Sequence, residues 1–222
     1  TSALGAAPTA GSVATTVSPV GTYPIAVTRG ADNNYNFAYV NGTLTVNKAT
    51  LTASADNKSR LYGAANPTLT ITYTGFVNSE DASVLDTAPI ATTTALATSN
   101  VGSYPITVSG GDDSNYTFNY VPGTLAINKA ILSATAENKT RTYGTANPAF
   151  TISYSGFVNG DTPSVLDSPP VASSTVVATT PVGSYPISLT GGTDNNYDIV
   201  NTAGTITISK ANLTVTDQKA TR

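Results

Sequence analysis

Hydrophobic and polar residues alternate with a period of two along most of the chain. Alternation puts apolar side chains on one face of a strand and polar side chains on the other, as a half-buried β-strand requires. The clearest runs are Leu51–Ala55, Leu69–Tyr73, Ile106–Val108, Tyr116–Tyr120 and Leu125–Ile127. Turns rich in Gly, Pro, Asn and Asp separate them. The pattern predicts an all-β fold made of small antiparallel domains of the immunoglobulin-like sandwich type.

One segment carries a helical signal. In Ser79–Leu85, a residue that can cap the N-terminus of a helix precedes a segment long enough for a single helical turn. A longer helix would favour a β-grasp arrangement, in which one helix packs on a sheet, as the competing fold. Strand alternation by itself does not separate the two folds, because both contain half-buried strands.

The apolar positions of these runs predict a hydrophobic core for the middle of the chain. Many of them are β-branched or aromatic, and such side chains suit a pleated, half-buried surface. The predicted core residues are Leu51, Ala53, Leu69, Ile71, Tyr73, Phe76, Val84, Leu85, Tyr104, Ile106, Val108, Tyr116, Phe118, Leu125 and Ile127.

The chain repeats itself every 81 residues. Lys48, Lys129 and Lys210 are spaced by this period, and more than half of the positions in 48–128 are identical in 129–209. A fixed period indicates a tandem array of one small unit. The predicted division is residues 1–48 for the later part of a unit, 49–129 and 130–210 for two full units, and 211–222 for the opening strand of another.

The two ends leave two interpretations open. In the first, the chain is one segment of a longer array. The two partial units together lack the residues equivalent to 61–81, which favours this account. In the second, the strand Asn212–Arg222 inserts into the partial unit of another molecule, by donor-strand exchange. The junction at Thr124–Ala134 contains no flexible linker, so neighbouring units are expected to form a stiff or semi-stiff rod.

Composition narrows the classes of function. Cys, Met, Trp and His are absent, which excludes thiol chemistry, imidazole catalysis and nearly all zinc or iron sites. The net charge of −3, without a basic cluster, argues against nucleic acid as a partner. No apolar run is long enough for insertion into a membrane. With no convergent nucleophile and base, we expect that the protein is not an enzyme.

Long motifs in the chain resemble a known family. Each full unit opens with Lys-Ala-x-Leu-x-Ala-x-Ala and continues with Asn-Lys-(Ser/Thr)-Arg-x-Tyr-Gly-x-Ala-Asn-Pro and Tyr-(Thr/Ser)-Gly-Phe-Val-Asn. These motifs resemble the MBG-type (YGX) tandem repeat domains of bacterial secreted and surface adhesin-like proteins. The Tyr-Gly pair falls on Tyr62-Gly63 and Tyr143-Gly144. The resemblance implies a secreted, mostly β repeat without catalytic residues.

Acidic loops are the best candidates for ligand chemistry. Asp32, Asp112, Asp113 and Asp194 lie in three equivalent loops beside Asn residues. The carboxylate and amide oxygen atoms of these Asp and Asn side chains could bind calcium, so a weak calcium site is one interpretation. The other is an Asx-stabilised turn, because Asp and Asn accept hydrogen bonds from nearby backbone N–H groups. Asx turns are favoured, because the number of carboxylates differs among the copies.

Tyrosine and lysine offer two further hypotheses. Tyr62, Tyr104 and Tyr116 could bind sugars, although core or corner positions are commoner for such tyrosines. Lys58 follows Asn57, and the pair could form an isopeptide bond if it were buried beside a carboxylate. A solvated lysine is favoured, because lysine is rarely buried without a partner.

The sequence therefore predicts a structural and adhesive repeat segment of a large extracellular protein at the bacterial cell surface, acting as a stalk or a multivalent contact surface. Its expected partners are neighbouring repeats of the same protein and, beyond them, other copies in a filament or surface glycans and host or cell-surface proteins. An extracellular filament subunit and a carbohydrate-binding module are the alternative functions.

Overall fold

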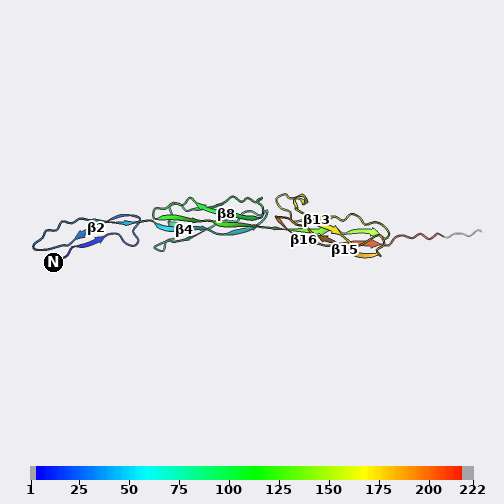
Figure 1. The fold of residues 1–222 in the computed structure, drawn as a ribbon, viewed down its shortest axis with the longest axis horizontal. Coiled ribbons are helices and arrows are strands. Elements are labelled where there is room, and N and C mark those ends of the chain that lie inside the picture. The colour runs from blue at the N-terminus through cyan, green and yellow to red at the C-terminus, as the bar shows by residue number, and fades with distance from the viewer. Residues whose placement is uncertain (1–3, 217–222) are drawn as a thin grey trace, which may run out of the picture. The chain divides into compact units, whose positions relative to one another are not determined.

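The computed structural model describes residues 4–216, which form three consecutive repeats of short strands (Figure 1). The first repeat contains one sheet of order β1-β2-β3. Its strands are β1 (Thr9–Ser12), β2 (Gly21–Thr28) and β3 (Gly42–Val46).

The middle repeat contains two sheets, of order β6-β4-β9 and β5-β10-β8-β7. Its strands are β4 (Ala49–Ala55), β5 (Lys58–Leu61), β6 (Ile71–Thr74), β7 (Ile90–Thr93), β8 (Gly102–Ser109), β9 (Tyr116–Val121) and β10 (Gly123–Asn128). A 3-10 turn, η1 (Ala82–Val84), lies between β6 and β7.

The third repeat has the same topology, with sheets β13-β11-β16 and β12-β17-β15-β14. Its strands are β11 (Ala130–Ala136), β12 (Lys139–Thr142), β13 (Ile152–Ser155), β14 (Val171–Ser173), β15 (Gly183–Thr190), β16 (Tyr197–Thr202) and β17 (Gly204–Ser209), with the turn η2 (Pro163–Val165) between β13 and β14.

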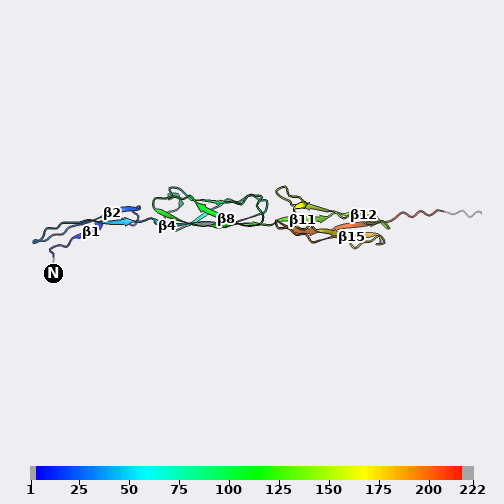
Figure 2. The same ribbon diagram turned by 45° about the horizontal axis from the view of Figure 1, so that its top comes forward.

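The two sheets of a full repeat pack face to face. In the third repeat, Ala136 of β11 lies in one buried cluster with Ile187 of β15 and Ile206 of β17. Figure 2 labels β11, β12 and β15 of this repeat. The strands alternate as the sequence predicts: β10 reads buried, intermediate, buried along most of its length. The all-β prediction is confirmed, and each complete repeat is a small sandwich of a three-stranded and a four-stranded sheet.

The strand pairing is mixed, which corrects the expectation of wholly antiparallel domains. β4 pairs in parallel with β9, and β11 pairs in parallel with β16. β12 and β17 are also parallel. Parallel partners need a crossover connection of a dozen or more residues. The chain between β4 and β9 supplies such a crossover, and hydrophobic alternation contains no information about strand direction.

The helical signal forms a single turn. Asp81 caps η1 by accepting a hydrogen bond from the backbone N–H of Ser83. Within the described part of the chain, η1 and η2 are the helical segments, and each has three residues. The β-grasp alternative requires a longer helix on the sheet, so the structure favours the sandwich.

About half of the predicted core of the middle repeat is fully buried. The buried members are Leu51, Ala53, Ile106, Val108, Tyr116, Leu125 and Ile127. The half-buried members are Leu69, Ile71, Tyr73, Phe76, Leu85, Tyr104 and Phe118. Val84 was expected in the core but is exposed. It lies in η1, and a single turn cannot direct all of its apolar side chains toward the sheets.

The first repeat shows how far strands depend on their partners. Residues 35–40 align with β9 yet form no strand. In the full repeats the equivalent segment pairs with the opening strand, and among the described residues 4–48 no strand pairs with residues 35–40. Tyr35 is therefore 58% exposed, whereas its equivalent Tyr116 is 2% exposed.

The described part of the predicted opening strand after the third repeat also forms no strand. Residues 211–216 have no regular structure, and the remainder of that prediction, residues 217–222, lies outside the described residues. Leu213 and Val215 are exposed, whereas the equivalent Leu51 and Ala53 in β4 are fully buried. A strand of this kind requires a sheet to join, because its backbone groups otherwise bond to water.

Contacts group the chain into two compact units. One comprises residues 1–58, 68–94 and 105–124, and the other comprises 59–67, 95–104 and 125–222. Each unit therefore contains one junction between consecutive repeats: the first junction lies in the first unit and the second junction in the second unit.

The incomplete first repeat allows a matched test of core packing. Leu125 is fully buried, whereas the equivalent Leu44 is 39% exposed. We expect Leu125→Ala to lower the free energy of unfolding by about 2–5 kcal/mol, because it leaves a cavity in a packed core. Leu44→Ala should cost less than about 1 kcal/mol. Urea denaturation measures both, and equal losses would contradict the incomplete core of the first repeat.

Candidate interaction site

The acidic loop of the middle repeat, residues 112–116, is organised around Asp113. This carboxylate is buried, and its Oδ1 accepts hydrogen bonds from the backbone N–H groups of Asn115 (2.7 Å) and Tyr116 (2.9 Å). Its Oδ2 accepts from the backbone N–H of Asp86 at 3.2 Å. The loop is therefore an Asx-stabilised turn at the start of β9, in which both carboxylate oxygens bind backbone donors.

The other two acidic loops follow the same design. Asp194 is buried and accepts from the backbone N–H groups of Asn196 and Tyr197, at 2.7 and 3.0 Å. Asp32 accepts from the N–H of Asn34 and, across the loop, from that of Gly5. These backbone bonds, led by the one from Asn34, lower the pKa of Asp32.

The predicted calcium ligands are thus largely used as hydrogen-bond acceptors. Asp113 and Asp194 point into the fold. Asp112 is exposed and pairs through its backbone with Thr87. Among the described residues, no group of three or more His, Cys, Asp or Glu side chains could hold a metal ion. Calcium binding stays a prediction from the sequence, and the geometry favours the Asx-turn interpretation.

The same loop forms the first junction between repeats. The Oδ1 of Asn115 accepts a hydrogen bond from the backbone N–H of Val20, at 3.0 Å. The Nζ of Lys48 donates to the carbonyl oxygen of Asp113 at 2.6 Å. The backbone N–H of Ala49, the first residue of β4, donates to the carbonyl of Asn115. Two donors of the first repeat and one from the start of β4 therefore bind one loop, named here the junction loop (112–116).

The second junction repeats this arrangement at residues 193–197, the second junction loop. The Oδ1 of Asn196 accepts from the backbone N–H of Val101 at 2.9 Å, and Lys129 Nζ donates to the carbonyl of Asp194 at 2.7 Å. Asn196 also donates through Nδ2 to the side chain of Asn100. Identical bonds in two places indicate a general joint of the array. Lys48 and Lys129, two of the three lysines that mark the period, are thus junction residues, a role that was not predicted from the sequence.

The three tyrosines considered for sugar binding contact the protein itself. Tyr62 and Tyr116 are buried, and the hydroxyl of Tyr116 donates to Glu80 at 2.6 Å. Tyr104 is half-buried, and its hydroxyl donates to the carbonyl of Asn100. These positions match core and corner roles, in which the ring packs and the hydroxyl finds a partner.

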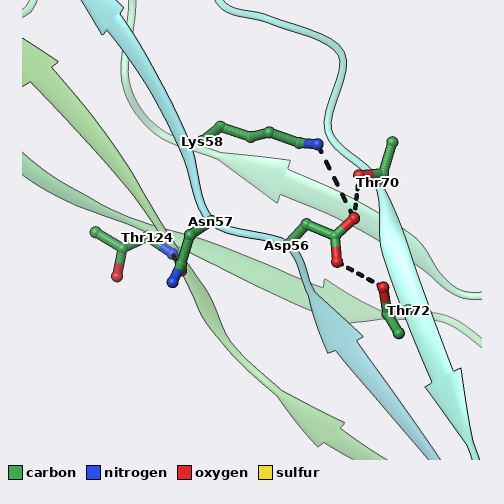
Figure 3. A network of polar contacts seen from close by, with 6 residues as sticks. All are labelled: Asp56, Asn57, Lys58, Thr70, Thr72 and Thr124. Atoms are coloured by element: carbon green, nitrogen blue, oxygen red, sulfur yellow. Dashed lines mark hydrogen bonds and ion pairs between the residues drawn. The ribbon is translucent and has the colours of Figure 1, made fainter.

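Lys58 and Asn57 point to different partners (Figure 3). Lys58 Nζ lies 3.9 Å from Asp56 Oδ2, while Asn57 Oδ1 accepts the backbone N–H of Thr124 at 2.8 Å. Asp56 also accepts from the hydroxyls of Thr70 and Thr72, and these two bonds, Thr70 first, lower its pKa. The side chain of Lys58 is partly exposed. The geometry therefore supports an ordinary lysine beside a carboxylate and gives no support to the isopeptide hypothesis.

A buried arginine is a further feature that was not predicted from the sequence. Arg60 is 7% exposed, and its guanidinium donates to Asn66 Oδ1 and to the carbonyl groups of Leu61 and Leu96. Arg141 makes the same set of bonds in the third repeat. The five donors of a guanidinium suit such a cluster of oxygen atoms. The recurrence of Arg in the Asn-Lys-(Ser/Thr)-Arg motif was the signal that could have identified it.

These features define a class of protein: a tandem array of small, cysteine-free β-sandwiches connected without linkers through asparagine and lysine bonds. Among the described residues, none belongs to a helix long and apolar enough to cross a membrane.

The chain belongs to the MBG domain (YGX type) family, which matches residues 2–45, 51–126 and 132–207. Three tandem matches confirm the family resemblance seen in the sequence. No curated protein matches the chain.

Calcium removal gives a direct test of the acidic loops. Because the buried carboxylates already accept backbone N–H groups, we expect the thermal unfolding midpoint to be the same in calcium and in excess chelator. Differential scanning calorimetry measures it, with magnesium as the control ion. A midpoint that rises with calcium alone would instead support the calcium interpretation.

Tyr197 makes stability sensitive to alkaline pH. Burial, together with its bond to the Asp161 carboxylate, raises the pKa of Tyr197 to about 12. An unfolded tyrosine titrates near 10. The folded state therefore favours the neutral phenol, and this contribution is complete below pH ~10 and is lost as the pH rises through ~12.

We expect the free energy of unfolding to fall more steeply between pH 10 and 12 in the native chain than in Tyr197→Phe, which has no phenol to ionise at this position. Urea denaturation across this range measures the difference. Identical pH dependence in the two proteins would contradict the assignment.

Proposed function

We propose that this chain is a stalk-like segment of an extracellular bacterial surface protein, in which repeats serve as spacers or as a multivalent contact surface. Membership of the MBG domain (YGX type) family supports a repeat module of a surface protein. Catalysis has no part in the proposal, because the sequence lacks the usual imidazole and thiol groups.

The observation that carries the proposal is the direct connection between repeats. β3 ends at Val46 and β4 begins at Ala49, while β10 ends at Asn128 and β11 begins at Ala130. Connections of one or two residues leave little freedom for a hinge. The asparagine and lysine bonds to each junction loop restrict that freedom further. Limited hinging is what a spacer requires.

Small-angle X-ray scattering tests the stalk. A compact protein of this length has a radius of gyration of about 17 Å. We expect at least twice this value, independent of protein concentration. Asn196→Ala should broaden the distribution of dimensions, because it removes the bonds to Val101 and Asn100. Asn195→Ala, which changes the exposed neighbour in the same loop, is the matched control. A radius near 17 Å would overturn the proposal.

A filament subunit is the second candidate, and the exposed surfaces of two segments favour it. Leu213 and Val215 are exposed in a segment that matches a buried opening strand. Tyr35 and Leu44 are exposed in the repeat that lacks such a strand. Insertion of residues 211–216 of one copy into the first repeat of another would cover both.

Scattering and single-particle images at several concentrations separate the two functions, because only a filament lengthens with concentration. Val215→Asp should abolish the lengthening, since it would place a carboxylate in a sandwich core. Carbohydrate binding has less support, because Tyr104 uses its hydroxyl within the protein. A glycan array with Tyr104→Ala as control examines that alternative.

A further inference from the structure

The Tyr62-Gly63 turn of the middle repeat docks on the third repeat. The hydroxyl of Tyr62 donates to Asp161 Oδ2 at 3.1 Å, and its ring meets that of Tyr197 edge to face, with centroids 5.5 Å apart. Gly63 has φ of +78°, and a Cβ atom at this position would lie 2.3 Å from a methyl carbon of Val158. All of these residues lie within the second compact unit. The pair that characterises the family is thus a docking element.

The chain also contains an undocked copy of this turn. Tyr143 is 44% exposed, whereas Tyr62 is 7% exposed. A Cβ atom on Gly144 would meet nothing within 4 Å, although Gly144 has a similar φ of +87°. The two turns have the same conformation and differ in what covers them. Burial of Tyr62 therefore comes from docking and not from the turn itself.

The docking surface also occurs twice. Val158, Asp161 and Tyr197 of the third repeat align with Val77, Glu80 and Tyr116 of the middle repeat. We use the term turn receptor for each of these sets of three residues. The turn receptor of the third repeat is filled by Tyr62 and Gly63, and Val158 is half-buried there. In the middle repeat, Val77 is 46% exposed.

A cavity of about 220 Å³ lies at the turn receptor of the middle repeat. Its lining includes Val77, Asn78 and Glu80, together with residues 16–20, and all of these belong to the first compact unit. Among the described residues 4–48, none forms a turn equivalent to Tyr62-Gly63. No such turn therefore covers the cavity within the described part of the chain.

The open turn receptor is already arranged for its ligand. The hydroxyl of Tyr116 donates to Glu80 at 2.6 Å, as that of Tyr197 donates to Asp161 at 2.7 Å. The backbone N–H of Val77 donates to the Tyr116 hydroxyl, as that of Val158 donates to Tyr197, each at 3.0 Å. A carboxylate accepts more than one donor. Glu80 can therefore also accept the phenol of an incoming tyrosine.

We infer that the cavity at Val77, Asn78 and Glu80 is a binding site for a Tyr-Gly turn of another MBG repeat. The phenol would donate to Glu80, and the glycine would let the backbone approach Val77 without a side chain between them. The filled turn receptor of the third repeat is the template for both contacts. The inference concerns one local site, so its test does not depend on whether the stalk proposal is correct.

Matched substitutions test the filled turn receptor first. Gly63→Ala and Gly144→Ala impose the same strain on a left-handed residue, but only Gly63→Ala also collides with Val158. We expect Gly63→Ala to lower the thermal midpoint by at least 2–4 °C more than Gly144→Ala, which corresponds to about 1 kcal/mol in a protein of this size. Tyr62→Phe should likewise lower the thermal midpoint by more than Tyr143→Phe does. Equal effects within both pairs would overturn the inference, since docking would then contribute nothing.

A peptide titration tests the open turn receptor in the whole chain. The probe is the decapeptide of residues 58–67, and the control peptide carries serine and valine in place of Tyr62 and Gly63. Backbone amide chemical shifts in the ¹⁵N-labelled chain report where each peptide binds. We expect saturable shifts at Val77, Asn78 and Glu80 at about millimolar peptide, because a free peptide must lose conformational entropy on binding. Glu80→Ala should weaken this binding at least several-fold.

Two outcomes of the titration would contradict the inference. One is the absence of shifts at Val77 and Glu80 up to ten millimolar peptide. The other is an equal response to the control peptide, which would indicate nonspecific adsorption. Shifts at the filled turn receptor, around Val158, serve as the internal control and should stay small, because Tyr62 competes there in the same chain at high effective concentration.

Discussion

The parallel pairing of each repeat's opening strand with a late strand is the constraint on which the rest of the structure depends. β4 pairs with β9, and β11 pairs with β16. The opening strand follows the preceding repeat directly, and its partner begins at the end of the junction loop. The pair therefore completes the sandwich and also brings the preceding repeat to that loop. In the first repeat, where the described residues form no such pair, residues 35–40 form no strand and Leu44 is exposed.

The joints themselves are held by neutral and charge-assisted hydrogen bonds. Asn115 and Asn196 each accept a backbone N–H from the preceding repeat, and Lys48 and Lys129 each donate to a carbonyl of the junction loop. Such bonds need fixed geometry at both ends, and the buried carboxylates of Asp113 and Asp194 supply it by binding the loop backbone. Acidic residues that suggest an ion site in the sequence thus shape a joint between repeats.

The two junctions are not equivalent, and their difference is informative. Both contain the asparagine and lysine bonds, and among the described residues a docked Tyr-Gly turn occurs at the second. The same chain therefore provides a filled and an open version of one surface, with Tyr62 buried and Val77 exposed. Within the filled version, the low polarity around Tyr197 and the Asp161 carboxylate raise the pKa of that tyrosine. An interface of this kind combines an aromatic contact with a partly buried hydrogen bond, which favours one docking geometry.

Local signals in the sequence were sufficient for the elements and the array. Strand alternation predicted runs such as Leu125–Ile127, because side-chain direction in a strand depends only on position along it. The 81-residue period and the Tyr-Gly motif likewise identified the repeat and its family. The turn at Asp81 was also visible, since capping involves residues two or three apart.

Only the tertiary structure determined the direction of strand pairing, which copies of a repeated segment form strands or become buried, and the roles of the polar residues. Tyr35 and Tyr116 have similar neighbours in sequence, yet one is exposed and the other is buried. Arg60 reaches the carbonyl of Leu96, and Tyr62 reaches Asp161, from positions distant in the chain. Such outcomes depend on which segment lies across the sheet or the junction. A strand or a docking turn is stable only where a partner satisfies its backbone and covers its apolar side chains, and no local pattern contains that information.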